Sequence, residues 1–493
     1  MSDITDLDAV TLSKAIHEKK LGCSEVMSAY LDRIEKYNPK INAIISMRSR
    51  EELIKEAKLL ENKEPTGWLH GIPVAIKDLA ETKGLKTTWG SPIFKEHIPN
   101  FDCIVSQRIK NAGAIVIGKT NTPEFGLGSH SYNPVHGVTR NPYDLTKTAG
   151  GSSGGAAAAL AARFLPIADG SDMMGSLRNP GAYNNVYGFR PSWGLVPNDA
   201  DGDIFMQTLA TSGPMARTPT DLAYLLQTLA GPNSLLPSNT TPEKSYTNEL
   251  NKSVSGMRIG WIGNWSNNYP YENGVLTICE EALSVYQKIG VKVDPFIPKF
   301  DTKKLWKSWL TLRSWAISNG MRDHYTDPKK RKMLKPEVIY EIESGLSLTA
   351  TQIHEASVIR SNWFRYLTEV FKNYDALALP SAQVFPFDIE KNWPSEINNI
   401  EMTTYHQWME VVIPVSLVGL PAINIPCGFN EQNLPMGLQL FGATGSDKSI
   451  LKFAQNYHLK TEWPIGIDQY SEDLCSIAIF MYCLISTNFT GYL

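Results

Sequence analysis

The stretch from Ala149 to Pro197 reads AGGSSGGAAAALAARFLPIADGSDMMGSLRNPGAYNNVYGFRPSWGLVP and holds the most informative pattern in the chain. Two clusters rich in glycine and serine, Gly150–Gly155 and Gly170–Ser176, stand on either side of an alanine-rich run. The alanine-rich run predicts a helix. Glycines beside a serine let the backbone adopt positive φ and let consecutive N–H groups point at one oxygen atom. The stretch therefore predicts two functional loops joined by one short helix.

The overall composition is that of an ordinary globular protein. An apolar fraction of 42% with 20% charged residues sets aside disordered and collagen-like classes. The 493 residues contain no Pro/Ser/Gln-rich linker and no repeat, so one large domain is expected. A net charge of -3 argues against nucleic acid as a partner, because phosphate binding needs a basic excess.

The cysteines and the two chain ends bear on location. Six cysteines without CxxC or Cys/His zinc spacing predict reduced thiols and no metal site. The acidic, polar N-terminus lacks a secretory signal, so a cytoplasmic location is expected. Residues 474–485 form an apolar run that is shorter than the roughly 17–25 residues needed to span a bilayer. We interpret this run as a core or interface segment in preference to a membrane contact.

Apolar patterning predicts an α/β architecture. Leu7, Val10 and Ile16 have the spacing of one amphipathic helix, and Ser24 is placed to cap a second. Short apolar runs punctuated by Gly and Pro predict strands that alternate with helices. The further predicted elements are a helix over 104–109, a helix from Thr218 to just before Gly231, and strands over 71–78, 114–118, 257–262, 376–379, 422–425 and 437–441.

Residues from about 300 to 410 are predicted to be helical and to cover the substrate. This segment is rich in tryptophan, and most of its tryptophans are expected to be core residues.

Two formal motif matches fail on their context. Gly113–Thr120 satisfies the phosphate-loop pattern, but its middle is a β-branched strand and Pro123 interrupts the helix that should follow. Gly151–Gly155 satisfies the pattern of an α/β-hydrolase nucleophile elbow and would make Ser153 the nucleophile. No strand precedes it, because residues 141–147 look like a turn, so this interpretation ranks behind the next one.

The stronger constellation is Lys77, Ser152 and Ser176. Hydrolysis of an amide needs a nucleophile, a base and donors for the oxyanion. A lysine acts as a base only when neutral, and Lys77 ends an apolar strand where burial would lower its pKa from about 10.4. Ser152 is then placed to relay a proton between Lys77 and Ser176.

These residues resemble the amidase signature family, whose hallmark is a Ser-cisSer-Lys triad. The resemblance reaches to about residue 465 and implies a single large α/β domain with a central mixed β-sheet covered by helices on both faces. It implies a hydrolase of carbon–nitrogen bonds other than peptide bonds, with no metal and no organic cofactor. The matching motifs are 71–78, 118–121, the block 150–155, 175–180, 213–217 and 419–422.

The resemblance also implies roles for individual residues. Lys77 would be the base, Ser152 the serine preceded by a cis peptide bond, and Ser176 the nucleophile that forms an acyl-enzyme. The oxyanion hole would be formed by the backbone amides of Met173, Met174, Gly175 and Ser176. The supporting residues would be Ser153, Asp172 and Arg178.

The chain departs from the family pattern at one functionally important place. The family usually has Asp-Thr-Gly-Gly-Ser where this chain has Asp-Met-Met-Gly-Ser over 172–176. We expect Met174 to fit with negative φ and to narrow the acyl pocket; the alternative is a distorted oxyanion hole with low activity. Tryptophans and methionines suggest an apolar or aromatic acyl group.

The predicted organisation is an N-terminal helical layer over 1–65, the amidase signature domain over 66–465, and a C-terminal extension over 466–493. The expected partner is a small amide substrate, and a homodimer would be common for such enzymes. Three alternatives stay open: an amidotransferase component of the same family, an esterase that uses Ser153, and a catalytically weak binding protein kept in view by Met174.

Overall fold

The architecture is that of a mixed sheet built from segments distant in sequence. The computed structural model describes residues 3–199, 202–206, 208–237, 240–461 and 463–464. The run 474–485 lies outside the described residues. Among the described residues, no helix combines the length and the apolar composition needed to cross a membrane.

The central sheet has eight strands in the order β10-β9-β11-β15-β14-β7-β8-β6. β9 runs parallel to both β10 and β11, while the other neighbours are antiparallel, so the sheet is mixed as predicted. These strands are β6 (Ile167–Asp172), β7 (Tyr187–Arg190), β8 (Thr211–Ala216), β9 (Arg258–Trp261), β10 (Lys292–Pro295), β11 (Ala376–Pro380), β14 (Ala422–Phe429) and β15 (Pro435–Phe441).

A second sheet has the order β1-β3-β2. It lies beside the edge strand β6, and a hydrogen bond from the Lys77 backbone N–H to Asp169 Oδ1 (3.0 Å) joins the two. The end of β2 is therefore held next to the functional loops. The strands outside the central sheet are β1 (Ile44–Ile45), β2 (Pro73–Lys77), β3 (Ile115–Thr120), β4 (Tyr132–Asn133), β5 (Gly137–Val138), β12 (Glu396–Ile397) and β13 (Ile400–Glu401).

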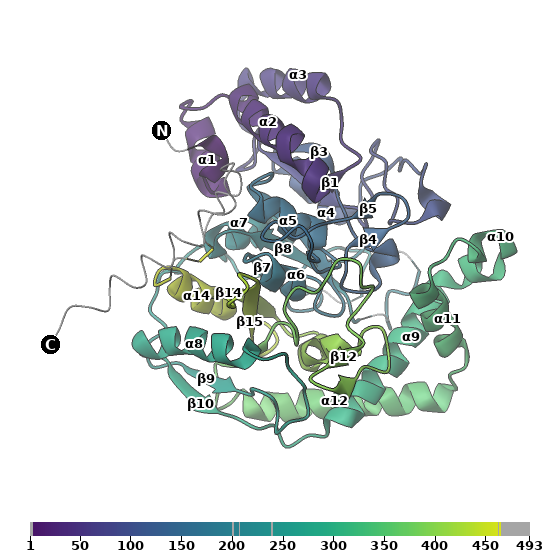
Figure 1. Cartoon of the computed structure of the whole chain (residues 1–493). Coiled ribbons are helices and arrows are strands. Elements are labelled where there is room, and N and C mark those ends of the chain that lie inside the picture. Colours follow the sequence, from purple (N-terminus) through teal and green to yellow (C-terminus); the bar gives the residue numbers. More distant parts are fainter. Residues whose placement is uncertain (1–2, 200–201, 207, 238–239, 462, 465–493) are drawn as a thin grey trace.

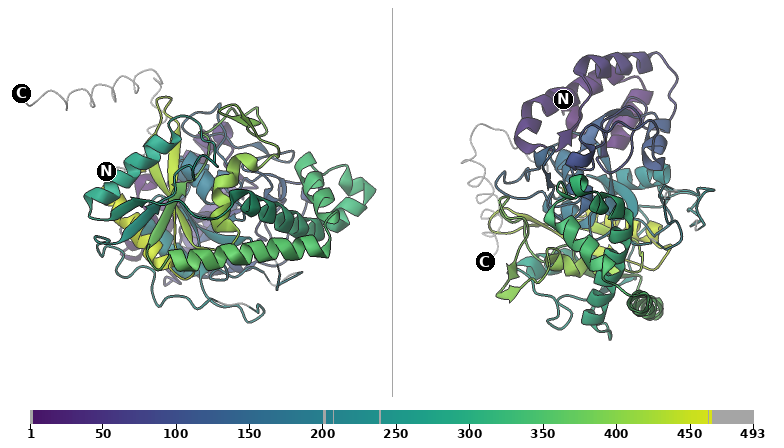
Figure 2. Two further views of the ribbon diagram at one scale, coloured as in Figure 1. Left: turned by 90° about the horizontal axis from the view of Figure 1, so that it is seen from below. Right: turned by 90° about the vertical axis from the view of Figure 1, so that its right-hand side faces the viewer.

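Helices cover both faces of the central sheet (Figures 1 and 2). Those of the first half are α1 (Ala9–His17), α2 (Cys23–Ile41), α3 (Arg50–Glu61), α4 (Ile104–Asn111), α5 (Gly154–Ala161), α6 (Arg178–Tyr183) and α7 (Pro219–Leu229). Those of the second half are α8 (Val275–Lys288), α9 (Thr302–Thr326), α10 (Pro328–Arg331), α11 (Pro336–Leu346), α12 (Ala350–Val370), α13 (Ile413–Ser416) and α14 (Asp447–His458).

One continuous hydrophobic core runs from Ala9 in the first helix to Tyr457 in the last. The N-terminal helices α1–α3 gather at one end of the molecule in Figure 1, and their apolar faces belong to this same core. Residues 1–65 are not purely helical, because Ile44 and Ile45 form β1 and pair with β3.

The alanine-rich run forms the helix that its composition predicts. Every residue of α5 is buried, and small side chains are what allow this. A Cβ atom on Gly155 would lie 2.3 Å from the backbone nitrogen of Asn121, so this approach of helix to strand end requires glycine.

The six strands predicted from apolar runs and the capped helix α7 are confirmed, but two expectations were wrong in detail. Ser24 is not a helix cap: α2 begins at Cys23, and both the backbone N–H and the hydroxyl of Ser24 donate to Glu61 at 2.7 and 2.6 Å. The segment 300–410 is not helical throughout. Its long helices end at Val370, Ala376–Pro380 forms β11 inside the central sheet, and only the short 3-10 helix Gln407–Val412 follows near its end.

Candidate active site

Lys77 stands at the end of β2 with its amine enclosed by serines. Its side chain is buried, at 1% exposure. The Nζ atom lies 2.8 Å from the Oγ atoms of both Ser152 and Ser153, and 3.0 Å from Ser171 Oγ. Hydroxyls either donate or accept, so this environment suits a neutral amine as well as a charged one.

Burial changes the proton affinity of this amine. Loss of solvent lowers the pKa of Lys77 to about 7, although the charges of Asp169 and Asp172 oppose the shift. A substantial share of the molecules therefore holds Lys77 neutral at neutral pH. This is the state that a general base requires.

Ser176 shares a cavity with this lysine–serine group. The cavity, called the serine cavity below, has a volume of about 320 Å³ and includes Ser152, Ser171 and Ser176 in its wall. Ser176 is 7% exposed, and its hydroxyl has no hydrogen-bond partner among the described residues. The rest of the wall is mainly apolar, with Leu79, Phe125, Leu127, Met173, Met174 and Ile317.

The backbone joins the two serine loops directly. The peptide bond between Gly151 and Ser152 is cis, as the family resemblance implies. The N–H of Ser153 donates to the carbonyl oxygen of Ser176 at 3.3 Å. The link from Lys77 to Ser152 is thus a hydrogen bond in the structure, whereas Ser152 and Ser176 line one cavity without a direct hydrogen bond.

The four amides expected to form an oxyanion hole are not equivalent. The N–H of Gly175 already donates to Asp172 Oδ1 at 2.9 Å, and its part in an oxyanion hole stays a prediction. The N–H groups of Met173, Met174 and Ser176 have no hydrogen-bond partner among the described residues. These three remain the candidates to stabilise an oxyanion.

Met174 fits in the way expected from the sequence. Its φ angle is not positive. Its side chain is 4% exposed and lies in the wall of the serine cavity. The residue that does need glycine is the next one. Gly175 has a φ of 78°, and a Cβ there would lie 2.9 Å from Val412 Cγ1.

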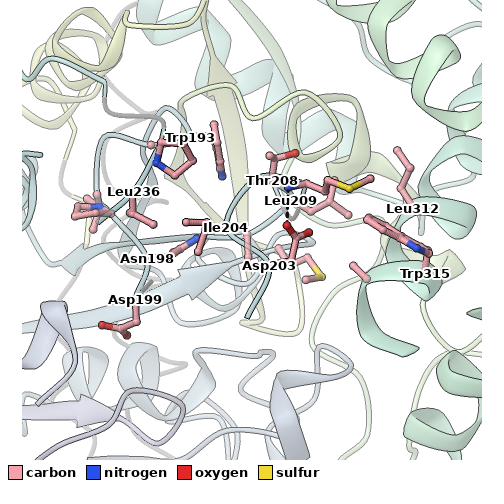
Figure 3. Close-up of a pocket in the computed structure, with 18 of the residues that line it drawn as sticks. Trp193, Asn198, Asp199, Asp203, Ile204, Thr208, Leu209, Leu236, Leu312 and Trp315 are labelled. Carbon is pink, nitrogen blue, oxygen red and sulfur yellow. Dashed lines mark hydrogen bonds between the residues drawn. The ribbon is translucent and has the colours of Figure 1, made fainter. Parts of the chain in front are cut away.

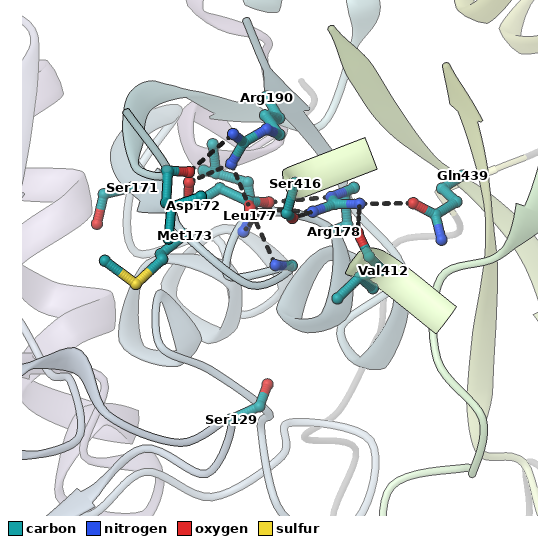
Figure 4. Close-up of polar contacts among 12 residues, drawn as sticks. Ser129, Ser171, Asp172, Met173, Leu177, Arg178, Arg190, Val412, Ser416 and Gln439 are labelled. Carbon is teal, nitrogen blue, oxygen red and sulfur yellow. Dashed lines mark hydrogen bonds and ion pairs between the residues drawn. The ribbon is translucent and has the colours of Figure 1, made fainter. Parts of the chain in front are cut away.

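Asp172 fixes the loop that carries Ser176 (Figure 4). Besides Gly175, it accepts from the N–H of Leu177 at 3.2 Å and from both Nε and Nη2 of Arg178 at 3.0 Å. Arg190 adds a contact of 2.9 Å. Burial alone would raise the pKa of Asp172, but the charges of Arg178 and Arg190 hold it well below its ordinary value.

Arg178 is itself held on its far side. It donates to Gln439 Oε1 and Ser416 Oγ, both at 2.6 Å, and to the carbonyl oxygen of Val412 at 3.1 Å. The Ser176 loop is thereby attached to β15 and α13 (Figure 4).

Replacing Asp172 with asparagine should destabilise the fold strongly. Both arginines are fully buried and would lose their counter-charge, which typically costs about 3–5 kcal/mol. Urea unfolding followed by circular dichroism measures this loss. The exposed Asp323→Asn variant is the control and should unfold as the natural protein does, and an Asp172→Asn midpoint equal to that of the control would contradict the role of Asp172.

A second cavity of about 210 Å³ adjoins the serine cavity (Figure 3). Leu312 and Trp315 of α9 form one side, and Trp193 and Ile204 lie on the other. Three residues line both cavities, namely Met173, Ala210 and Ala316. Trp315 therefore contributes to a cavity wall, while Trp309, Trp363 and Trp408 are core residues as expected.

The two misleading motifs have structural roles. Residues 115–120 form β3, and the buried Lys119 donates to Ala80 O and Thr82 Oγ1 at 2.5 and 3.0 Å, so no phosphate loop is present there. Ser153 is fully buried, and its hydroxyl contacts Lys77. The residues before it form no strand, so the nucleophile-elbow context is missing.

Sequence reasoning missed Asp169 and Ser171. Both lie on β6, where alternate side chains face opposite ways, so Asp169 and Ser171 face Lys77 while Asp172 faces the arginines. The twofold spacing of polar residues in Ile167–Asp172 was a signal that could have found them. Arg190 and Arg313 lacked any comparable local signal.

The described residues contain no group of three or more His, Cys, Asp or Glu side chains that could hold a metal ion. Four cysteines, Cys23, Cys103, Cys279 and Cys427, are free and buried. The cytoplasmic location expected from the sequence stays a prediction.

The chain is similar to known proteins over almost its whole length. A family model described as Amidase matches residues 25–451. The chain is 33% identical to a glutamyl-tRNA(Gln) amidotransferase subunit of Alkaliphilus metalliredigens (strain QYMF), with 93% of this chain and 97% of that protein covered. It is 30% identical to an acylamidase of Rhodococcus erythropolis, with 93% and 96% covered. The solved structure of a bacterial aryl acylamidase of the amidase signature family superposes with a TM-score of 0.86 at 25% identity, covering 93% of this chain and 96% of that one.

Proposed function

Because the chain belongs to the amidase signature family, whose members hydrolyse carbon–nitrogen bonds, we propose that it hydrolyses a small aliphatic, aryl or cyclic carboxamide through an acyl-enzyme at Ser176. The observation that carries the proposal is the buried Lys77 amine, 2.8 Å from Ser152 Oγ, in a group that borders the same cavity as Ser176.

The proposed reaction moves one proton along this group. Neutral Lys77 takes the proton of Ser152, Ser152 takes that of Ser176, and the Ser176 oxygen forms a bond to the amide carbon. The N–H groups of Met173, Met174 and Ser176 stabilise the oxyanion. The proton then passes back to the leaving nitrogen as the carbon–nitrogen bond breaks. Water repeats the sequence on the ester and releases the carboxylic acid.

The lining of the serine cavity favours an apolar acyl group. Leucine, phenylalanine, isoleucine and methionine side chains make up most of its wall, and apolar walls with few polar groups are typical of small-molecule sites. The similarity to an aryl acylamidase and to an acylamidase supports acyl amides as the substrate class.

Labelling with a fluorophosphonate followed by peptide mapping tests the nucleophile. The proposal expects one modified serine, Ser176. Modification of Ser153 would support the esterase alternative, and absence of any label would support a binding protein without catalysis. A panel of aryl, alkyl and lactam amides then defines the leaving group and the acyl group.

Replacing Met174 with glycine should widen the acyl pocket. We expect kcat/KM for a hexanoyl anilide to rise about tenfold relative to the acetyl anilide, because space lost to the methionine side chain becomes available to the acyl chain. The exposed Met333→Gly variant is the control. An unchanged ratio between the two anilides in Met174→Gly would show that Met174 does not shape the pocket.

A second candidate function is that of an amidotransferase component. The 33% identity to an amidotransferase subunit over 93% of this chain favours it. The purified chain alone distinguishes the two: turnover of simple amides without added proteins supports an independent amidase. Activity that appears only when partner proteins are added would support the amidotransferase.

A further inference from the structure

A buried arginine lies in the wall of the serine cavity. Arg313 of α9 is 3% exposed. It is the single charged residue among the described residues that line this cavity. A guanidinium has five N–H donors and no acceptor. Buried polar and charged groups are usually hydrogen-bonded, so the Arg313 donors that lack an acceptor in the protein are available to a ligand.

Only two of the five donors meet a strong acceptor. Nε donates to Glu341 Oε1 at 2.7 Å, and Nη2 donates to the hydroxyl of Tyr405 at 2.8 Å. Nη1 lies 3.1 Å from Met173 Sδ, and a thioether is a weak acceptor. The remaining two N–H groups have no acceptor among the described residues. Because Met173 also lines the cavity, the Nη1 end of the guanidinium borders the open space.

The other end of Arg313 is rigidly held. Glu341 of α11 is fully buried and accepts from Tyr405 Oη at 2.7 Å and from Ser314 Oγ at 2.6 Å. Burial raises the pKa of Glu341, but the charge of Arg313 outweighs this and holds it below its ordinary value. Burial lowers the pKa of the neighbouring His406 to about 3, so it is neutral. The arginine–glutamate pair is therefore fixed and has no net charge.

We propose that Arg313 is a specificity residue that donates hydrogen bonds to a second, neutral carbonyl oxygen of the substrate. The inference rests on the proposed amide hydrolysis at Ser176. A neutral acceptor fits better than a carboxylate, because Glu341 already balances the guanidinium and a further buried negative charge would lack compensation.

Arg313 and Ser176 line the same cavity of about 320 Å³, so both carbonyl groups of the substrate must fit inside this volume. A cavity of this size is at the lower end of the range for small-molecule sites, which favours a short linker. The predicted substrate class is therefore a compound with two carbonyl groups on a short linker, such as a diamide or an N-acylated amino amide.

Three linear amides test this class with the natural protein. Pentanediamide has two carboxamides, pentanamide has one, and 4-carbamoylbutanoate has a carboxylate in the second position. We expect kcat/KM, measured by ammonia release, to be at least about tenfold higher for pentanediamide than for pentanamide after division by its two equivalent amides. Equal values would overturn the inference. A preference for 4-carbamoylbutanoate over pentanediamide would contradict the inference that Arg313 binds a neutral carbonyl oxygen.

Variants locate the preference at Arg313. The double variant Arg313→Met/Glu341→Gln removes both charges together, so no buried charge is left unpaired. We expect its diamide preference to fall to near unity, chiefly through a higher KM for pentanediamide. The exposed Arg322→Met in the same helix is the control and should keep the preference. A preference retained in the double variant would overturn the role of Arg313.

A milder variant keeps the test informative if the double variant does not fold. Tyr405→Phe removes only the hydroxyl that contacts both charged groups, and it should reduce the diamide preference severalfold. Protection of Ser176 from the fluorophosphonate by pentanediamide gives a second measurement, which does not require turnover. Failure of the proposed function would appear differently, as absence of both labelling and hydrolysis across the whole amide panel.

Discussion

Replacing Ser176 with alanine should abolish amide hydrolysis, with kcat falling by about 10⁴-fold or more. The expected loss follows because alanine has no oxygen to form the acyl-enzyme. Ammonia or aniline release from the best amide of the panel measures the loss. The same variant should no longer react with a fluorophosphonate.

The Ser176→Ala result needs a control for folding and for the alternative nucleophile. The side chain is small, so thermal unfolding should be close to that of the natural protein. Ser153→Ala is the informative companion. It removes a partner of Lys77 and should lower the rate, yet leave Ser176 reactive toward the label. Normal hydrolysis by Ser176→Ala would end the proposed mechanism.

Replacing Lys77 with alanine should lower kcat/KM by about 10²–10⁴-fold and change its pH dependence. In the natural protein the folded pKa of about 7 lies below the reference value of 10.5, because burial disfavours the ammonium. The base is therefore protonated and inactive below pH 7. We expect kcat/KM to rise about tenfold per pH unit up to that point and to level off above it.

The Lys77→Ala profile should lack this plateau. Residual hydrolysis would keep rising above pH 7, because hydroxide must then remove the serine proton. The exposed Lys95→Ala variant should retain the natural profile. A natural protein whose kcat/KM is flat from pH 5 to pH 8 would contradict Lys77 as the base.

The same pKa shift affects stability in a known direction. Between pH 7 and about 10.5 the unfolded chain binds a proton at Lys77 that the folded protein does not bind. The Lys77 contribution to the free energy of unfolding therefore increases with pH across this window. Comparison of urea unfolding at pH 7 and pH 9 for the natural protein and for Lys77→Ala isolates this contribution.

Local sequence signals predicted most of the site because glycine–serine loops are specified by neighbouring residues. Gly175 needs a positive φ, which the sequence supplies directly before Ser176. Lys77 closes an apolar run that becomes β2, so its position at a strand end was evident. The same local signals could not show that the N–H of Gly175 already donates to Asp172.

Long-range contacts were beyond these signals. Serine is a residue type that often caps helices, but the N–H and hydroxyl of Ser24 both donate to Glu61, 37 residues away. Arg313 looks like any polar residue of a helical segment. Its importance appears only when α11 places Glu341 against it and α9 turns it toward the serine cavity.

The sequence by itself determined the family and the α/β class, and it singled out Lys77, Ser152 and Ser176 as the proposed triad, because these inferences depend on residue order and on the backbone freedom of adjacent glycines. Only the tertiary structure decided the proton affinity of Lys77 and the character of the cavity. Desolvation arises when β2 packs beside β6 and α5, and the Arg313–Glu341 pair forms only when two helices meet. Both are properties of packing, since they depend on which distant groups exclude water from one another.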